Sequence, residues 1–489
     1  MKNKIENPRV LLISFFDKAA LGPRMLLTSL QNAGYKNSFL VFFGEKEDYN
    51  EKEIKNNFKS FFSLVEFINP DIIGISLLCP RFLKVAIDII NLVKEKNKER
   101  FIIIGGQNII LSPEKYIPHA DAVCTGEGQE AILKFIKLFS EKKDYYKINN
   151  FWFKKKNDII KNELSPRQDI NDAPSIRYFN KKEFYIDDGK IKSYLSYKNM
   201  NAVYIMCSSG CPFECSYCLC PIIDKKLNKK RFCVHNKSVS KIIGELKYLK
   251  KLGFKYFTFV DRIFPWQPDY VGEFSKRYKK EIGLPFNLYA HPKLVKKEVM
   301  KNLASAGLSQ VMLGVQTGSE KIRKEIYNRN DSNETIINSS KILNDLNIPI
   351  CYDFIVDNPY ETKKDYKKTF NFLLKLKSPF IMNIYSLILI PGTPLTERIL
   401  KDDSIKKERL FSQNHISLNK PEDLDKINIK ENEQFYILLY LLTQIKSIPK
   451  SFIWLLSKNK KIGSLIALKL LKIYKPRIRV SLLRKKNEK

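Results

Sequence analysis

Three cysteines in the middle of the chain have the spacing of a metal site. Cys211, Cys215 and Cys218 follow the pattern C-x3-C-x2-C in the stretch Cys-Pro-Phe-Glu-Cys-Ser-Tyr-Cys. Thiolates bind zinc and iron–sulfur clusters. Three thiolates would leave one iron of a four-iron cluster without a protein ligand, and such an open position can bind a substrate or a cofactor.

The neighbouring cysteines allow two other interpretations, a zinc site and a ferredoxin-type cluster. Six of the nine cysteines lie between positions 207 and 233, and we expect reduced thiols because no export signal is visible. A zinc site could recruit Cys220, Cys233 and His235, but zinc ligands usually come as C-x2-C pairs. A ferredoxin-type cluster needs a fourth cysteine, and Cys220 follows Cys218 too closely to chelate comfortably. The three-cysteine cluster is therefore favoured.

Composition indicates a globular protein of two or three domains. The chain has 489 residues and 44% hydrophobic residues, with no signal peptide and no apolar run of about 18 residues, which predicts a cytoplasmic location. Net charge is +34, but the lysines are spread along the chain, so no nucleic-acid partner is expected. The exception is the basic C-terminus, which could make a weak membrane-surface contact.

The N-terminal part reads as a doubly wound, Rossmann-like α/β domain over positions 1–145. Buried strands are predicted at 10–16, 72–78 and 101–104, and helical patterns lie between them. Ligands of such parallel sheets bind at the carboxyl ends of the strands. Positions 146–197 are rich in Lys, Asn and Asp, and predict a linker with one short hairpin.

The strand–helix alternation returns over positions 198–398. Six strand candidates there predict a partial (β/α)6 barrel of the TIM type, with chemistry at the carboxyl ends of its strands; they lie at 203–206, 256–260, 286–289, 310–315, 349–356 and 383–390. Positions 399–489 read as a basic helical extension. We expect it to cover the open barrel, with a membrane-surface or partner helix as the alternative.

The cysteine motif resembles the signature of the radical S-adenosylmethionine (radical SAM) superfamily. In that family the three cysteines hold a four-iron, four-sulfur (4Fe-4S) cluster, and S-adenosylmethionine chelates the fourth iron. The resemblance therefore assigns Cys211, Cys215 and Cys218 to the cluster. Tyr217 stands where the family places an aromatic residue that contacts the adenine.

Later stretches of the predicted barrel resemble further motifs of the family. Asp261 matches a residue that meets the methionine amino group, although Arg262 stands where a second acidic residue is common. Gln316 replaces a glutamate and could still hydrogen-bond a ribose hydroxyl, and Arg329 could pair with the methionine carboxylate. The implied S-adenosylmethionine site comprises Tyr217, Asp261, Gln316, Arg329, Asp353, Pro391 and Gly392.

The N-terminal domain resembles the cobalamin (B12)-binding domain that precedes many radical SAM enzymes. Glycines at its strand ends would let a bulky ligand approach the backbone. The implied cobalamin contacts are Ser76, Leu77, Gly105, Gly106, Gln107, Gly126, Glu127 and Gly128. No Asp-x-His-x-x-Gly motif is present to supply a cobalt ligand, so the segment 77–81 is expected to face cobalt, with Arg81 near the metal as a hypothesis.

The resemblance covers positions 8–395 and implies an enzyme with three cofactors, namely the 4Fe-4S cluster, S-adenosylmethionine and cobalamin. It implies methylation of an unactivated carbon, or of a phosphinate phosphorus, through a 5'-deoxyadenosyl radical. The substrate would be an unidentified small or lipid-like molecule, and the electron donor a flavodoxin or ferredoxin.

Other functions stay open. One alternative is a radical cyclase or rearrangement enzyme, and another is a non-catalytic iron–sulfur protein. A tRNA methylthiotransferase is disfavoured, because that group needs three more cysteines in its N-terminal domain and only Cys79 and Cys124 are available here.

Overall fold

The computed structural model describes residues 7–15, 20–44, 51–77, 82–193, 201–228, 234–405 and 431–474, without side chains at 51, 52 and 431–433. It divides into two compact units. The first comprises Met1–Met200 and Ile222–Cys233, and the second comprises Asn201–Pro221 and Val234–Lys489. The segment directly after the cysteine motif therefore packs with the first unit.

The first unit is built on a nine-stranded sheet in the order β7-β6-β5-β4-β3-β1-β2-β8-β9. Its centre is parallel and consists of β1 (Val10–Phe15), β2 (Ser38–Phe43), β3 (Ile72–Ser76), β4 (Phe101–Gly105) and β5 (Ala122–Cys124). Its helices are α1 (Leu21–Asn32), α2 (Glu51–Ile68), α3 (Leu83–Lys96), the short α4 (Gln107–Leu111) and α5 (Gly128–Ser140).

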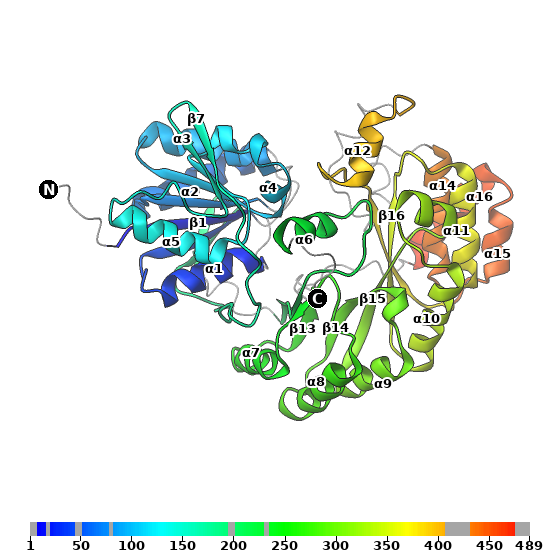
Figure 1. Cartoon of the computed structure of the whole chain (residues 1–489). Coiled ribbons are helices and arrows are strands. Elements are labelled where there is room, and N and C mark those ends of the chain that lie inside the picture. The colour runs from blue at the N-terminus through cyan, green and yellow to red at the C-terminus, as the bar shows by residue number, and fades with distance from the viewer. Residues whose placement is uncertain are drawn as a thin grey trace. The chain divides into compact units, whose positions relative to one another are not determined.

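Two hydrophobic cores cover the two faces of this sheet. On one face, Leu27 of α1 and Phe135 of α5 pack against Val10 and Leu12 of β1. On the other face, Phe61 of α2 and Ile89 of α3 pack in a second core (Figure 1). Strands buried on both faces are the reason that these segments read as continuous apolar runs. The predicted doubly wound α/β fold is confirmed.

Positions 146–197, where the sequence predicts a linker with one short hairpin, contain two hairpins at the two edges of the sheet. They are formed by β6 (Phe151–Lys155) with β7 (Asp158–Lys161), and by β8 (Glu183–Asp187) with β9 (Lys190–Ser193). The lysines of these edge strands face solvent, while Phe151, Phe153 and Tyr185 are buried in the core. The polar composition was therefore that of half-exposed strands and not of a linker.

The second unit contains a six-stranded parallel sheet in sequential order, β10-β13-β14-β15-β16-β17. The strands are β10 (Ala202–Ile205), β13 (Tyr256–Phe259), β14 (Phe286–Ala290), β15 (Leu308–Gln316), β16 (Ile350–Val356) and β17 (Ile381–Ser386), with a small pair β11 (Ser208–Ser209) and β12 (His235–Asn236). The predicted partial barrel is confirmed as a curled sheet, a half-barrel (Figure 1).

Helices on the outside of this sheet are held by its outward-facing residues. Phe259 and Phe286 pack edge to face at 5.5 Å, and Phe286 lies 4.8 Å from Tyr278 of α8. These outer helices are α7 (Val239–Lys251), α8 (Pro268–Glu281), α9 (Lys297–Ala306), α10 (Asn333–Asp345) and α11 (Lys363–Lys375). Helix α12 (Pro394–Lys401) lies apart from them and packs against Ile322 and Tyr327 (Figure 1). Alternate residues of the same strands therefore face the interior of the half-barrel, where a site can form.

The C-terminal extension is helical, as predicted, in α14 (Glu431–Thr443), α15 (Lys450–Leu456) and α16 (Lys460–Tyr474). Helix α14 packs on α11, and the hydroxyl of Tyr440 donates to the carbonyl of Tyr366 at 2.7 Å. The sequence predicts that the extension covers the open barrel. Instead it packs on α11, which belongs to the outer helical layer (Figure 1). Within the described residues, no helix is long and apolar enough to cross a membrane.

Candidate active site

The three-cysteine motif lies in a loop between β11 and α6 (Cys220–Asn228). All three thiols are half-buried. The loop is fixed at Ser216, whose N–H donates to the carbonyl of Tyr327 at 3.0 Å and whose carbonyl accepts from the N–H of Leu395 at 2.9 Å. Two segments that are distant in the sequence therefore hold the centre of the motif in place.

The electrostatics of the loop show that the three thiols are neighbours. Burial, with smaller contributions from the Cys215 and Cys218 thiols, raises the pKa of Cys211 to about 12. Arg262 acts in the opposite direction on the pKa of both Cys211 and Cys218. The thiols are therefore protonated in the protein alone, and binding a metal would release their protons. Arg262, which replaces the expected acidic residue, favours the thiolates.

The donor set suits a cluster better than a single ion. Within the described ranges, no group of three His, Cys, Asp or Glu residues could hold one metal ion. In a four-iron cluster each thiolate binds a different iron, so the sulfurs need not converge on one point. The N–H of Cys220 donates to the Cys218 sulfur at 3.4 Å. Hydrogen bonds to the ligand sulfurs help to set the reduction potential of such clusters.

Asp261, predicted to contact S-adenosylmethionine, is buried and fully engaged with the start of the cluster loop. One carboxylate oxygen accepts from the N–H of Cys207 at 2.8 Å and from the N–H and hydroxyl of Ser208, and the other accepts from the Cys207 thiol at 3.3 Å. Burial raises the pKa of Asp261 to about 6 despite these bonds. This geometry supports positioning of the loop; a direct cofactor contact stays a prediction.

A chain of contacts links two aromatic residues of the cluster loop through the rim of the half-barrel. Phe213 stacks on His291 with ring centroids 3.6 Å apart. The Nε2 of His291 lies 3.5 Å from Asp331, which also pairs with Arg329 at 2.9 Å. Arg329 donates to the Tyr217 hydroxyl at 3.4 Å and to the carbonyl of Gly314 at 2.8 Å.

This chain changes the role expected of Arg329. Its guanidinium is already paired inside the protein, so the geometry supports a residue that orients Tyr217, and a contact with the methionine carboxylate stays a prediction. Neither Asp331 nor His291 belongs to the S-adenosylmethionine site that the sequence predicts. The spacing Arg329-x-Asp331 was the only signal that could have indicated the pair.

Other predicted cofactor residues lie at the end of β15, within β16 and in the segment after β17. Gln316 has a φ of +72°, beside a register shift between β15 and β16. Such a backbone is unusual for a residue other than glycine and occurs often at functional sites. Asp353 accepts from the amide of Asn383 at 2.7 Å. Pro391 is half-buried and Gly392 exposed, in the turn before α12.

Deeper in the half-barrel, two buried polar side chains lack partners. Thr258 of β13 and Asn287 of β14 are paired in register. Neither the hydroxyl of Thr258 nor either amide atom of Asn287 has a hydrogen bond among the described residues. Both lie on the face opposite Phe259 and Phe286. A polar interior next to the cluster loop fits a polar ligand or bound water.

In the first unit, small residues form a row along the carboxyl edge of the sheet. Ser14 pairs with Ser76, and Ser76 pairs with Gly105. The next residue, Gly106, has a φ of +131°, and a Cβ there would lie 2.2 Å from the Leu77 carbonyl oxygen. This edge lets a flat ligand approach the backbone, which fits cobalamin.

Two buried hydroxyl groups near the carboxyl edge of this sheet also indicate that a ligand binds there. The side chains of Ser14 and Thr125 are buried, and their oxygens have no hydrogen bond among the described residues. Neither residue is among the predicted cobalamin contacts, although Thr125 directly precedes Gly126. The segment expected to face cobalt falls largely on residues 78–81, including Cys79 and Arg81, which lie outside the described residues; Cys233 does as well.

Some of the remaining predicted cobalamin contacts already bind or pack against other residues that the structure describes, and others do not. Glu127 lies 3.4 Å from Arg167 and accepts from the N–H of Gln168 at 2.8 Å. Gly126 packs so closely on Asn150 that a Cβ would lie 2.3 Å from its Oδ1. Gln107 is exposed, and Gly128 begins α5. Leu77 is fully buried. All of these cofactor contacts stay predictions.

Comparison with known proteins agrees with both sites. Residues 205–373 match the model of the radical SAM superfamily, and residues 10–136 match the model of the B12 binding domain. A protein of Pyrococcus horikoshii named as an uncharacterized methyltransferase is 26% identical over 70% of this chain and 72% of its own length. The bacteriochlorophyllide d C-8(2)-methyltransferase of Chlorobaculum tepidum is 21% identical over 73% of each chain.

Solved structures show the same fold. The radical S-adenosylmethionine methyltransferase TsrM from Kitasatospora setae superposes with a TM-score of 0.64, covering 80% of this chain and 76% of that one at 14% identity. Some further relatives are named methylthiotransferases. The radical SAM domain implies a 4Fe-4S cluster and S-adenosylmethionine, and the B12 binding domain implies cobalamin. The chain therefore belongs to the radical SAM superfamily, with a B12-binding domain ahead of its radical SAM domain.

Proposed function

We propose that the protein is a cobalamin-dependent radical SAM methyltransferase. The observation that carries the proposal is the combination in one chain of a three-thiol loop on a parallel half-barrel and a B12-binding unit with a row of small residues along the carboxyl edge of its sheet. Two of the similar proteins are named methyltransferases. The substrate class is an unactivated carbon or a phosphinate phosphorus of a small or lipid-like molecule.

The bound cofactors would supply the radical and the methyl group, and this chain's residues would bind, orient and shield them. Cys211, Cys215 and Cys218 would hold the cluster. Tyr217 would contact the adenine, oriented by Arg329. These tasks need exclusion of water, which the half-buried loop and its anchors favour.

The remaining residues of the S-adenosylmethionine site would come from β15, β16 and the turn before α12. Gln316 would hydrogen-bond the ribose, and Asp353, Pro391 and Gly392 would complete the S-adenosylmethionine site. The cobalamin edge would use Ser76, Gly105 and Gly106, and the residues from Gly126 to Gly128. An external reductant is required, for which we propose a flavodoxin or ferredoxin.

A methylthiotransferase is the second candidate because several relatives carry that name. The sequence before position 201 contains two cysteines, Cys79 and Cys124, of which Cys124 is buried. The part of the chain before position 201 therefore cannot supply the three cysteines of a second cluster. Methyl transfer is favoured over sulfur insertion on this ground.

The experiment is anaerobic reconstitution with iron, sulfide and hydroxocobalamin, followed by S-adenosylmethionine and a chemical reductant. A methyltransferase is expected to form both 5'-deoxyadenosine and S-adenosylhomocysteine, measured by mass spectrometry. Deoxyadenosine alone would favour a cyclase or a rearrangement enzyme. Neither product would indicate a non-catalytic cluster protein.

The matched control replaces Cys220, a neighbouring cysteine that is not part of the three-cysteine motif. Cys215→Ala should lose both products and the cluster absorbance. Cys220→Ala should keep them, because the N–H that donates to Cys218 belongs to its backbone and survives the substitution. Equal loss in both variants would contradict the assignment of the three ligands.

A further inference from the structure

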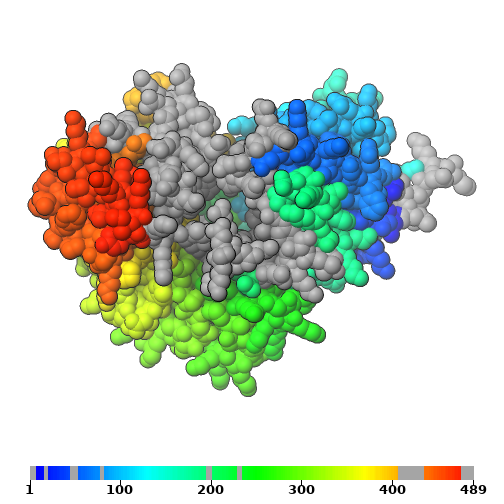
Figure 2. Space-filling model, turned by 180° about the vertical axis from the view of Figure 1, so that it is seen from behind, coloured from blue at the N-terminus to red at the C-terminus, as the bar shows by residue number. Residues whose placement is uncertain are grey.

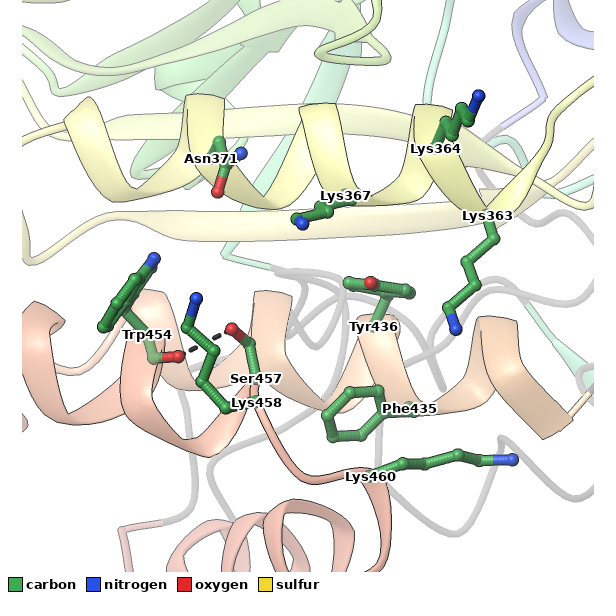
Figure 3. A pocket seen from close by; sticks show the side chains of 10 residues that line it. All are labelled: Lys363, Lys364, Lys367, Asn371, Phe435, Tyr436, Trp454, Ser457, Lys458 and Lys460. Carbon is green, nitrogen blue, oxygen red and sulfur yellow. Dashed lines mark hydrogen bonds between the residues drawn. The ribbon is translucent and has the colours of Figure 1, made fainter.

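A groove in the second unit is lined by lysines from two separate parts of the chain. Lys363, Lys364 and Lys367 come from the first two turns of α11, and Lys458 and Lys460 from the region between α15 and α16 (Figure 3). Among the residues that the structure describes, the lining contains no acidic side chain. Five ammonium groups around one groove repel each other unless an anion lies between them.

The helices that form one wall of this groove also expose apolar side chains. Trp454 lines the groove and is 46% exposed, and Leu455 beside it is 60% exposed. On α16, Ile462, Leu465 and Ile473 are 55%, 63% and 71% exposed. So many large apolar groups on neighbouring helices mark an interaction surface.

The exposed apolar residues of α16 lie on the side of the helix opposite its buried residues. Its buried residues are Gly463, Ala467 and Leu471, spaced four apart, so they form one stripe toward the protein. Ile462, Leu465 and Lys469 lie on the opposite side. Figure 2 shows α15 and α16, in orange and red, at the surface of the molecule.

We propose that α15, α16 and the lysine groove form a docking surface for an anionic lipid bilayer. Positions 450–474 contain six lysines and no aspartate or glutamate. Lys458 lies 3.9 Å above the ring of Trp454, so a cation and an indole sit together where a headgroup boundary would be. The leucine and isoleucine side chains enter the acyl boundary, and the lysines bind the lipid phosphates.

The same observations disfavour other occupants. A second copy of this face would bring two lysine-rich surfaces together, which costs free energy. A free phosphate would satisfy the groove but would leave the apolar residues of α16 in water. An interfacial position agrees with the finding that no helix among the described residues can span a membrane.

The test is sedimentation of the reconstituted full-length protein with vesicles. Vesicles of phosphatidylglycerol and phosphatidylcholine in equal parts should bind the protein, and vesicles of phosphatidylcholine alone should not. The triple variant K363E/K364E/K367E should lose binding by roughly tenfold or more. The control K276E/K279E/K280E changes the net charge equally on α8, in another part of the same unit, and should bind like the wild type.

A second pair of variants tests the apolar contribution. L455S/L465S should also weaken binding severalfold, whereas F67S/I191S, which replaces two exposed apolar residues of the first unit, should not. Retained cluster absorbance in every variant shows that it has folded.

Three results would overturn the proposal. The first is that wild-type protein stays in the supernatant with anionic vesicles, or that the α8 control loses as much binding as the α11 variant. The second is abolition of binding by inorganic phosphate at constant ionic strength, which would indicate a site for free phosphate. The third is a wild-type dimer that L455S/L465S converts to a monomer, which would indicate an interface between copies.

Discussion

The ring of Phe213, two residues after Cys211, lies flat against the imidazole of His291, with ring centroids 3.6 Å and planes 13° apart. His291 follows β14, so this stack ties the cluster loop to a strand end of the half-barrel. Tyr217 ties the loop a second time, through Arg329 and Asp331. The cluster loop is therefore held from both sides by one connected set of side chains.

The stack should be measurable as cluster retention. Phe213→Leu keeps an apolar side chain but removes the ring contact, which is worth about 1 kcal/mol beyond burial. We expect roughly fivefold faster loss of iron to a chelator, because 1 kcal/mol corresponds to about that factor. The control is Phe452→Leu, at an exposed position of α15. Equal rates in the two variants would show that the stack does not hold the loop.

Asp331 should be needed for stability as well as for orientation of Arg329. Both residues are buried, and Asp331→Asn would leave the Arg329 guanidinium without its anion. Loss of one partner of a buried pair costs about 3–5 kcal/mol, measurable by denaturant unfolding under anaerobic conditions. Asp269→Asn, at an exposed position at the start of α8, should change stability by less than about 0.5 kcal/mol.

His291 makes stability depend on pH in a known direction. Burial, with the nearby charges of Arg329 and Lys293, lowers the pKa of His291 to about 2. Its Nδ1 accepts from the N–H of Lys293, so the ring is neutral. The unfolded chain binds a proton below pH ~6.5 and the folded chain does not, so the stability that His291 contributes is present above that pH and lost as pH falls.

The measurement compares unfolding free energies of the wild type and His291→Gln between roughly pH 5 and 7. Above pH ~6.5 the difference between them should be constant. Below it, the wild type should lose about 1.4 kcal/mol per pH unit relative to the variant. A difference independent of pH would mean that His291 titrates normally in the folded protein.

Much of this fold could be predicted because its strands are buried on both faces. The strands β1, β3 and β4 stand out as continuous apolar runs. The six half-barrel strands stand out as short, mostly apolar runs interrupted by inward-facing polar residues such as Thr258 and Asn287. The edge hairpins could be predicted only in part, as one short hairpin in a linker, since β8 and β9 mix buried Tyr185 and Ile186 with exposed residues such as Lys190. Strand β5 has only three residues, too few to show a period.

The site divides in the same way. Cys211, Cys215 and Cys218 could be predicted because these three ligands lie within eight consecutive residues of the sequence. The set of Phe213, His291 and Asp331 could not, because its members come from three segments that only the curled sheet brings together. Asp261 illustrates a further limit: its type suggested a ligand contact, while its four hydrogen bonds support the loop.

Gln316 offers a test that separates strain from binding. Its φ of +72° costs a non-glycine residue about 1 kcal/mol or more. Gln316→Gly should therefore keep or slightly raise the stability of the protein while weakening S-adenosylmethionine binding severalfold, measured by isothermal titration. Asn328→Gly, at a φ of +52°, is the control that relieves a similar backbone without a proposed ribose contact. Unchanged affinity in Gln316→Gly would remove Gln316 from the cofactor site.

Gly105, the last residue of β4, and Gly106, which follows it, should respond differently to substitution, and the difference tests the cobalamin edge. At Gly106 an added Cβ would strike the Leu77 carbonyl at 2.2 Å, so Gly106→Ala should destabilise even the cofactor-free protein, by several kcal/mol. At Gly105 the nearest atom would be the Cys124 Cβ at 3.6 Å, an ordinary contact. Gly105→Val should therefore fold, since valine suits a strand, yet place two methyl groups where the corrin would lie. We expect it to retain at least tenfold less cobalamin after gel filtration, with unchanged thermal unfolding of the cofactor-free protein. Full cobalamin retention by folded Gly105→Val would move the cofactor away from this edge.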